Sequence, residues 1–219
     1  VGDKGKLHCA SFTVPSYCLE ANFRQKEPEL LICTPDDSPQ AVLFRDVLNE
    51  EELTVLFQTT LSLPFRGLRR QETGGVWKGR GLKVAELLAL SFPLQNLFLK
   101  RLCAEVAKIG FIPFPWTCVT WNKGPANEGR PHQHPNNAPH LLQWLVPCGS
   151  FTSGGGLFLP QLHQEVHVSP GSVLAFNGRL IEHQAKPTVG PRCSVVFFCD
   201  RDTTVWALDP SREREPCIF

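Results

Sequence analysis

Two histidines in a short proline-flanked segment are the residues of this sequence best suited to metal chemistry. His132 and His134 alternate between Pro131 and Pro135. In an extended backbone, residues i and i+2 point to the same side, so both imidazoles can face one ion. The prolines fix φ on either side and stiffen that presentation. Because neutral imidazole is a common ligand for iron, zinc and copper, the spacing predicts part of a metal site.

His183, far along the chain, is the candidate third ligand. It follows the β-prone run 172–176 and precedes the turn at 186–187, so it could return from an opposite sheet to the histidine pair. Three ligands on one side of an ion leave positions open for a substrate and O₂, as in non-haem Fe(II) oxygenases. His163 with Glu165 is a weaker alternative, because few residues separate Glu165 from His183. The alternative is that these histidines bind no metal and are ordinary surface or hydrogen-bonded residues.

A cation that could point into a barrel follows His183. Arg192 and Ser194 open the apolar run 195–198 and alternate onto one face of the expected strand. A buried guanidinium needs an anion, and a bidentate pair with a carboxylate satisfies it. Both side chains could therefore hold one carboxylate. The alternative is an exposed arginine after the turn at 190–191.

The elements that must position these residues begin with helices. Asn49 and Glu52 have the spacing of a capping box, and this predicts a helix over residues 49–61. Apolar residues at spacings of three and four predict another helix over 94–109, after a helical stretch near 84–90. Residues 1–40 are expected to form a peripheral strand or two and a loop.

Short β-prone runs dominate the chain from residue 111 onward. Pro, Gly and Asn turns separate runs at 117–121, 141–146, 156–159, 165–168, 172–176, 193–199 and 203–206. Helices followed by many short strands indicate a mainly β protein with supporting helices (α+β), either an all-β barrel or a jelly roll.

Size and composition fit one globular domain without a membrane span. The chain has 219 residues, of which 42% are hydrophobic and 20% charged, and no apolar run approaches the roughly 20 residues of a spanning helix. Its nine cysteines form no Cys-x-x-Cys and are odd in number, which predicts buried free thiols of an intracellular protein. Since the formal net charge is only +1, a nucleic-acid partner would need a local basic patch, and the loop from Arg66 to Lys83 is the best candidate.

Taken together, these motifs resemble the Fe(II)/2-oxoglutarate dioxygenases, and most closely the TET/JBP branch, which oxidises methyl groups on nucleic-acid bases. The branch has a His-x-Asp-x-x-Asn segment, a Gly-Gly-x-Leu strand, a Pro-Gly turn, a distal His and an Arg-x-Ser. The similar segments here are 130–137, 149–160, 170–171, 183 and 190–198. The resemblance implies a double-stranded β-helix (jelly-roll or cupin-like) catalytic core over 111–208. Residues 1–110 would supply N-terminal strands and support helices of the same domain, and 209–219 a C-terminal tail.

The resemblance also implies cofactors and a role for each matched residue. His132 and His183 would bind Fe(II), and Arg192 with Ser194 would hold the carboxylate of 2-oxoglutarate. Asn137 matches the asparagine that hydrogen-bonds the flipped target base. The implied substrate is a methyl group on a 5-methylcytosine- or thymine-like base, in DNA rather than RNA. A base inside a duplex cannot reach a buried metal, so the nucleotide must be flipped out or single-stranded. A monomer in the nucleus or cytoplasm is expected.

One position departs from the family pattern. His134 stands where the family has its Asp ligand. A third imidazole can still bind iron, so His132, His134 and His183 remain the predicted metal-binding and catalytic set, with one negative charge fewer. Two alternatives follow from this departure: a catalytically impaired relative that acts as a binding module, and a three-His cupin-type dioxygenase of small molecules.

Overall fold

A large antiparallel sheet forms the frame of the molecule in the computed structural model. The structure describes residues 8–10, 28–33, 35, 39–63, 71–75, 91, 93–95, 97–98, 101–102, 108, 116–123 and 130–208. Within these ranges the sheet has eight strands, and every pairing in it is antiparallel. In spatial order the strands are β1 (His8–Ala10), β2 (Pro28–Cys33), β3 (Pro39–Phe44), β10 (Val173–Phe176), β6 (Gln143–Gly149), β13 (Arg192–Phe198), β5 (Cys118–Lys123) and β4 (Gln71–Gly75).

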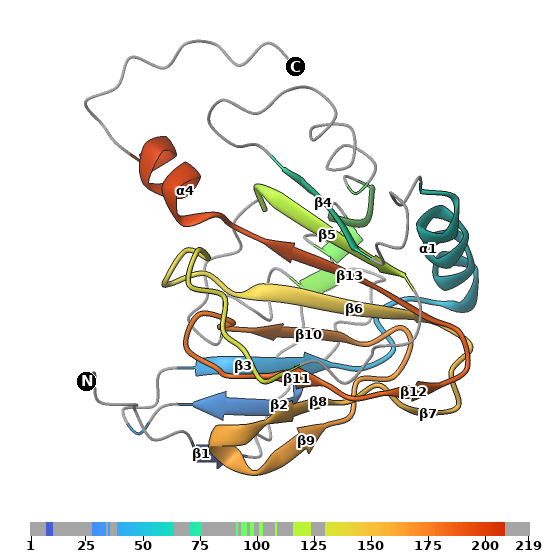
Figure 1. Cartoon of the computed structure of the whole chain (residues 1–219), viewed down its shortest axis with the longest axis horizontal. Coiled ribbons are helices and arrows are strands. Elements are labelled where there is room, and N and C mark those ends of the chain that lie inside the picture. The colour runs from blue at the N-terminus through green and yellow to red at the C-terminus, as the bar shows by residue number, and fades with distance from the viewer. Residues whose placement is uncertain are drawn as a thin grey trace.

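A second layer of short strands covers part of this sheet (Figure 1). One group has the order β11-β8-β9, and a pair is formed by β12 and β7. The bounds are β7 (Ser153–Gly154), β8 (Leu157–Leu159), β9 (Gln164–Val166), β11 (Gln184–Ala185) and β12 (Thr188–Val189), with a short 3₁₀ helix η1 (Pro160–Leu162) between β8 and β9. Two antiparallel layers with strands that pass between them make the double-stranded β-helix predicted from the sequence.

The two faces of the large sheet pack against different partners. Cys193, Val195 and Phe197 of β13 belong to a core that also contains Leu56 and Phe98 from helical segments. We call this the helix-side core. The opposite face contributes to a second cluster that includes Leu145, Leu159, Val166, Leu174 and Ile181, with Val196 packed against it. We call this the barrel core. Because side chains alternate along a strand, Arg192 and Ser194 share the barrel-core face with Val196.

Helix α1 (Glu50–Ser62) begins at the predicted capping box and contacts β5 and β6. The Asn49 side chain accepts a hydrogen bond from the Glu52 backbone, and the Glu52 carboxylate accepts one from the Asn49 backbone, each at 2.9 Å. The Arg101 guanidinium donates two hydrogen bonds of 2.8 Å to Glu52. Residues 93–95, 97–98, 101–102 and 108 are helical, as predicted. The stretch 84–90 and the rest of 94–109 lie outside the described residues.

One sequence-based expectation about secondary structure is wrong. The run 203–206 was predicted as a strand, but it lies in helix α4 (Arg201–Leu208). Asp200 explains the difference, because its carboxylate accepts a hydrogen bond of 3.0 Å from the Thr203 backbone and so caps the helix despite its β-branched residues. The strand or two expected at the periphery from residues 1–40 are β1 and β2, which lie at one edge of the sheet beside β3. The predicted tail 209–219 lies outside the described residues.

The burial of the cysteines and the lengths of the helices agree with what the composition predicts. Cys33, Cys118, Cys148, Cys193 and Cys199 are buried thiols outside any disulfide, as predicted for cysteines that pack as small apolar groups. Among the described residues, no helix has the length and apolar character needed to cross a membrane.

Candidate metal and carboxylate site

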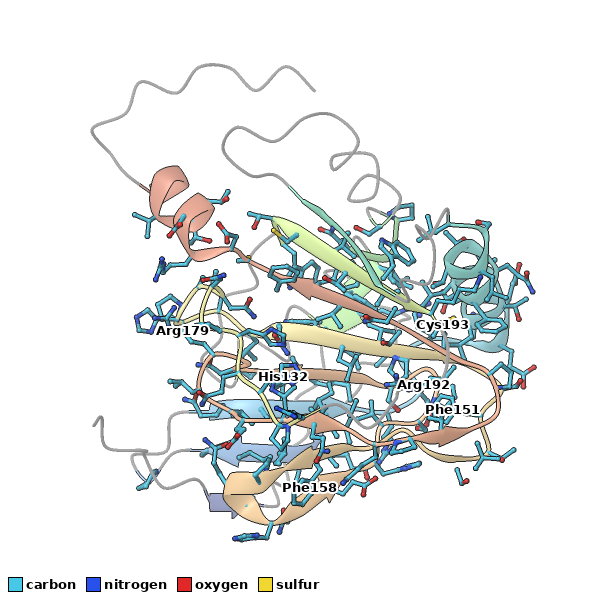
Figure 2. The ribbon with its side chains drawn as sticks, in the orientation of Figure 1. His132, Phe151, Phe158, Arg179, Arg192 and Cys193 are labelled. Atoms are coloured by element: carbon cyan, nitrogen blue, oxygen red, sulfur yellow. The ribbon has the colours of Figure 1, made fainter. Side chains whose placement is uncertain are left out.

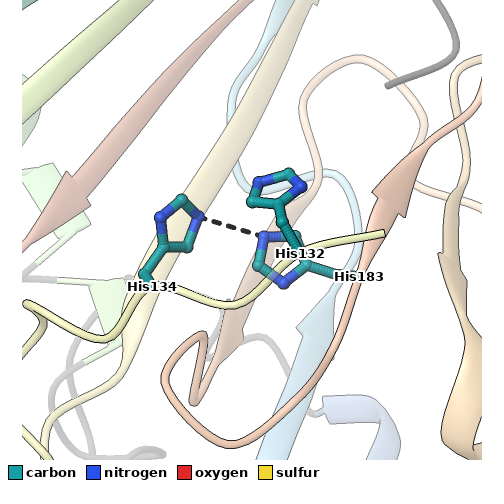
Figure 3. A group of neighbouring side chains, drawn as sticks. All are labelled: His132, His134 and His183. Atoms are coloured by element: carbon teal, nitrogen blue, oxygen red, sulfur yellow. Dashed lines mark hydrogen bonds between the residues drawn. The ribbon is translucent and has the colours of Figure 1, made fainter. Parts of the chain in front are cut away.

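The two histidine-bearing segments lie side by side although they are far apart in the sequence. His132 and His183 form an antiparallel bridge in which each backbone N–H donates to the other's carbonyl at 3.0 Å. A third backbone bond, 2.7 Å long, runs from His134 to Gly178. The fold therefore brings the predicted pair and the predicted third ligand together (Figure 3).

The three imidazoles converge on one point. One ligand nitrogen from each of His132, His134 and His183 lies within 4.8 Å of the others. The Nε2 atoms of His134 and His183 are 3.1 Å apart. Two nitrogens at right angles around one ion, each at about 2.1 Å from it, would be separated by about 3.0 Å. The observed spacing therefore fits two adjacent coordination positions of a single metal ion.

Backbone carbonyls orient two of the rings. His132 Nδ1 lies 3.0 Å from the Arg130 carbonyl, and His183 Nδ1 lies 2.9 Å from the Ile181 carbonyl. A carbonyl can only accept, so each Nδ1 must carry the proton, and each Nε2 then keeps its lone pair free for a metal. This is the usual outer support of metal-binding histidines. With the His183 proton on Nδ1, its Nε2 accepts the hydrogen bond that Figure 3 marks between it and His134 Nε2.

Burial keeps two of the ligands neutral. It lowers the pKa of His134 to about 4, with a further contribution from His132. Burial likewise lowers the pKa of His183 to about 3, despite the opposing hydrogen bond to Ile181. Neutral imidazole is the form that binds metals. His132 is exposed, so one side of the cluster opens toward solvent.

Arg192 is a buried cation without a counter-ion in the described part of the chain. Its side chain is 5% exposed, and its Nε atom has no hydrogen-bond partner there. Burial lowers the pKa of its guanidinium below the ordinary value. The Phe151 ring lies 5.9 Å from its Cζ atom, and Figure 2 shows the two residues side by side. An unpaired buried guanidinium is costly unless an anion binds to it, which fits the predicted carboxylate site.

A second buried polar atom without a partner lies next to Arg192, and sequence reasoning missed it. The Thr188 hydroxyl is buried and makes no hydrogen bond within the described residues. Gly155 separates the two side chains: a Cβ there would be 2.7 Å from Thr188 Cγ2 and 3.2 Å from Arg192 Nε. Gly155 thus lies in close contact with both side chains, and a larger residue there would have to displace them. The only sequence signal was the Gly154-Gly155 pair, since Thr188 looks like an ordinary strand residue.

Ser194 also lies on the barrel-core face of β13. It is 3% exposed, and its hydroxyl oxygen accepts a hydrogen bond of 3.3 Å from the Asn122 amide. Its own proton remains available to an acceptor. The predicted pairing of Ser194 with Arg192 around one carboxylate stays a prediction.

Asn137 is buried three residues after His134, and its backbone N–H donates to the His134 carbonyl at 3.0 Å. It is 7% exposed, and its side-chain amide donates to Gln143 Oε1 at 2.8 Å. The predicted contact between Asn137 and a substrate base stays a prediction, and it would need this amide or its carbonyl oxygen to be reached from the mouth of the barrel. Of the basic loop Arg66–Lys83, only β4 is described.

The metal cluster and the cation line the same interior. Phe176 of the barrel core packs edge-on against His183, with ring centroids 4.9 Å apart. Thr188 and Gly155, which flank Arg192, belong to the second layer or the turn next to it. The barrel thus holds, between its two layers, three convergent imidazoles and a guanidinium that no described residue pairs with.

No protein-family model matches the sequence, and no curated protein matches it either. Solved structures do match its fold. NgTET1 in complex with 5mC DNA aligns with a TM-score of 0.60 at 17% identity, over 84% of this chain and 81% of that one. The chain has the fold of the Fe(II)/2-oxoglutarate oxygenases. An oxidoreductase of the 2OG-Fe(II) oxygenase family from Burkholderia pseudomallei aligns with a TM-score of 0.51 at 14% identity, over 74% of this chain and 85% of that one. The resemblance inferred from the motifs is therefore confirmed at the level of the fold.

Proposed function

We propose that this protein is an Fe(II)- and 2-oxoglutarate-dependent dioxygenase that oxidises a methyl group on a nucleic-acid base. One observation carries the proposal: three imidazoles with converging nitrogens share the barrel interior with a buried arginine that has no counter-ion among the described residues. The first group suits a metal ion. The second suits the carboxylate of an acid that enters the same barrel.

His132, His134 and His183 would hold the iron. The spacing of 3.1 Å between two of their nitrogens fits adjacent coordination positions, and the carbonyls that anchor His132 and His183 keep their lone pairs directed at the ion. When bound, Fe(II) together with 2-oxoglutarate supplies the activation of O₂ for oxidation of a C–H bond. The exposed side at His132 is where a substrate would approach.

Arg192 would bind the distal carboxylate of 2-oxoglutarate, with hydroxyl groups on either side. Thr188 offers a buried hydroxyl with no described partner, and Ser194 offers the proton that its bond with Asn122 leaves free. Gly155 lets Thr188 and Arg192 lie this close together, because any side chain there would press on both. Together these donors would fix the acid in one orientation and hold its other end toward the metal.

The nucleic-acid substrate is supported by the similarity to NgTET1, which was solved in complex with 5mC DNA. A base in a duplex must leave the stack to reach a metal inside a barrel, so the enzyme would act on a flipped or single-stranded nucleotide. We propose that Asn137 helps to recognise that base and that the loop Arg66–Lys83 contacts phosphates. DNA is the expected polymer, and the enzyme is expected to work as a monomer in the nucleus or cytoplasm.

Two other readings start from His134. A three-His cupin-type enzyme for small molecules would use the same imidazoles, but it has no use for a 2-oxoglutarate clamp, and the unpaired Arg192 argues against it. A catalytically impaired relative would keep the barrel as a binding module. In that case the wild-type protein would be inert and His134→Asp would gain iron-dependent activity, whereas an active wild-type protein excludes this reading.

The test is turnover by iron-loaded protein. Protein with Fe(II), ascorbate and 2-oxoglutarate is incubated with oligonucleotides that contain either 5-methylcytosine or cytosine, as DNA and as RNA. Succinate and the mass of the base are then measured. We expect an oxidised base and matching succinate with methylated DNA, and neither with Arg192→Ala. If none of these substrates led to succinate, the dioxygenase proposal would be refuted. Succinate formed without base oxidation would refute the proposed nucleic-acid substrate.

A further inference from the structure

The turn that carries His134 is tied to the segment that carries His183 at several points. Backbone bonds join His132 to His183 and His134 to Gly178. These bonds end at His134. The chain continues beyond them as the turn 135–137, which we call the His134 turn. The position of the His134 ring therefore depends on what holds that turn.

All three carbonyls of the turn accept hydrogen bonds from outside it. The Asn136 carbonyl accepts one of 2.8 Å from the Arg201 backbone N–H. The carbonyls of Pro135 and Asn137 both accept from a single atom, Nη1 of Arg179, with the longer of these bonds at 3.2 Å. Arg179 lies only four positions before His183 on the same segment. Its side chain thus connects the two histidine-bearing segments.

The chemistry of this contact suits arginine in particular. One guanidinium nitrogen carries two N–H groups in a fixed plane, so it can satisfy two carbonyls at once, and it stays protonated at any physiological pH. The cationic charge itself works against a nearby metal ion, since like charges repel. What Arg179 contributes to a metal site must therefore come from its hydrogen bonds rather than from its charge.

We propose that Arg179 is a positioning residue that clamps the His134 turn to the His183 segment and thereby sets the affinity of the three-His site for its metal. This inference builds on the metal site of the proposed function but concerns a residue outside the ligand set. Figure 2 shows Arg179 toward the end of the barrel where α4 lies. Without the clamp, His134 would have to be ordered by the metal itself, and the lost order would appear as weaker binding.

A matched arginine lies on the other side of the same turn. The Arg201 side chain pairs with the exposed Asp202 at 2.9 Å, and only its backbone touches the turn. Arg201→Gln therefore removes the same charge from the same neighbourhood without removing a side-chain bond to the turn. Loss of charge alone should leave metal affinity unchanged or make it slightly tighter, which is the opposite of the effect expected at Arg179.

The experiment measures the Co(II) dissociation constant and visible absorption spectrum of wild type, Arg179→Gln, Arg179→Lys and Arg201→Gln, with the melting temperature of each metal-free protein. We expect Arg179→Gln to bind Co(II) about tenfold more weakly or worse, with a metal-free melting temperature close to wild type. Arg179→Lys keeps the charge, but its ammonium ends one bond nearer the backbone than Nη1 of arginine, so it should fall between them. Arg201→Gln should match wild type or bind more tightly.

Wild-type affinity in Arg179→Gln would overturn the clamp. If that variant does not fold, Arg179→Lys decides: weaker affinity supports the clamp and wild-type affinity overturns it. Equal weakening in Arg201→Gln would also overturn it, because the loss of affinity would then not depend on a side-chain hydrogen bond to the turn. A wild-type protein that binds no Co(II) would overturn the metal site and the clamp together, whereas the other outcomes leave the proposed function untouched.

Discussion

Replacing Arg192 by methionine should make the empty protein more stable and its binding of 2-oxoglutarate much weaker. Arg192 is 5% exposed and its Nε has no partner among the described residues. A buried polar group left unsatisfied costs about 1–3 kcal/mol, and more when it is charged. Methionine has a similar length and no charge, so the free energy of unfolding should rise by about that amount. For a chain of this size, each kcal/mol raises the melting temperature by about 2–4 °C.

The loss of binding should be larger than the gain in stability. A hydrogen bond to a charged group contributes about 1.5–3 kcal/mol, and a guanidinium can make two with one carboxylate. Arg192→Met should therefore weaken 2-oxoglutarate binding by at least about 100-fold, since about 1.4 kcal/mol corresponds to a factor of ten. Thermal melts of the metal-free protein measure the first effect. Calorimetric titration of the Mn(II)-loaded protein with 2-oxoglutarate measures the second.

Arg201→Met is the control, because its side chain is exposed and pairs only with the exposed Asp202. Both its melting temperature and its 2-oxoglutarate affinity should remain near wild type. The reasoning would be refuted if Arg192→Met melted at a lower temperature and bound 2-oxoglutarate as wild type does. Such a result would mean that the guanidinium stabilises the fold and is not a binding site for an anion.

Three further changes test other parts of the site and fold. Thr188→Val removes only a hydroxyl and should weaken 2-oxoglutarate binding about fivefold in calorimetry without lowering the melting temperature; a smaller effect than that of Ser194→Ala would contradict its role beside Arg192. His134→Asp places a carboxylate beside the metal and should tighten Mn(II) binding at least about tenfold, so equal or weaker binding in the same titration would count against the assignment of His134 as a ligand. Asn49→Ala removes the cap of α1 and should lower the free energy of unfolding in urea by about 1 kcal/mol, while Thr54→Ala on the same helix should change it less.

The sequence was sufficient to predict the features that depend on local spacing. The capping box at Asn49 and Glu52 forms as expected because its partners are three residues apart. His132 and His134 reach one point for a similar reason, since they alternate on one short segment. His183 and Arg192 were found because histidine and arginine in an apolar strand-rich region need a ligand or a counter-ion.

Features that depend on distant partners could not be predicted from spacing. Arg179 and Thr188 look like ordinary polar residues, and their roles appear only when the second layer and the His134 turn are in place. Asn137 gives no sign in the sequence that Gln143 will hold its amide. The strand predicted at 203–206 was wrong for a different reason. Its β-branched residues favour a strand locally, and the Asp200 cap overrides that preference.

Histidine at position 134, where the family has aspartate, changes the charge of the barrel interior as well as its ligand set. With three neutral imidazoles, nothing in the ligand set offsets the two charges of Fe(II), and Arg192 adds a third positive charge nearby. The two carboxylates of 2-oxoglutarate offset two of these, so one positive charge remains that an Asp ligand would have cancelled. Within the proposed function, this residual charge favours an anionic substrate such as a polynucleotide. The same reasoning gives His134→Asp a second signature: its tighter metal binding should come with weaker binding of 2-oxoglutarate, because the added carboxylate repels the acid that Arg192 attracts.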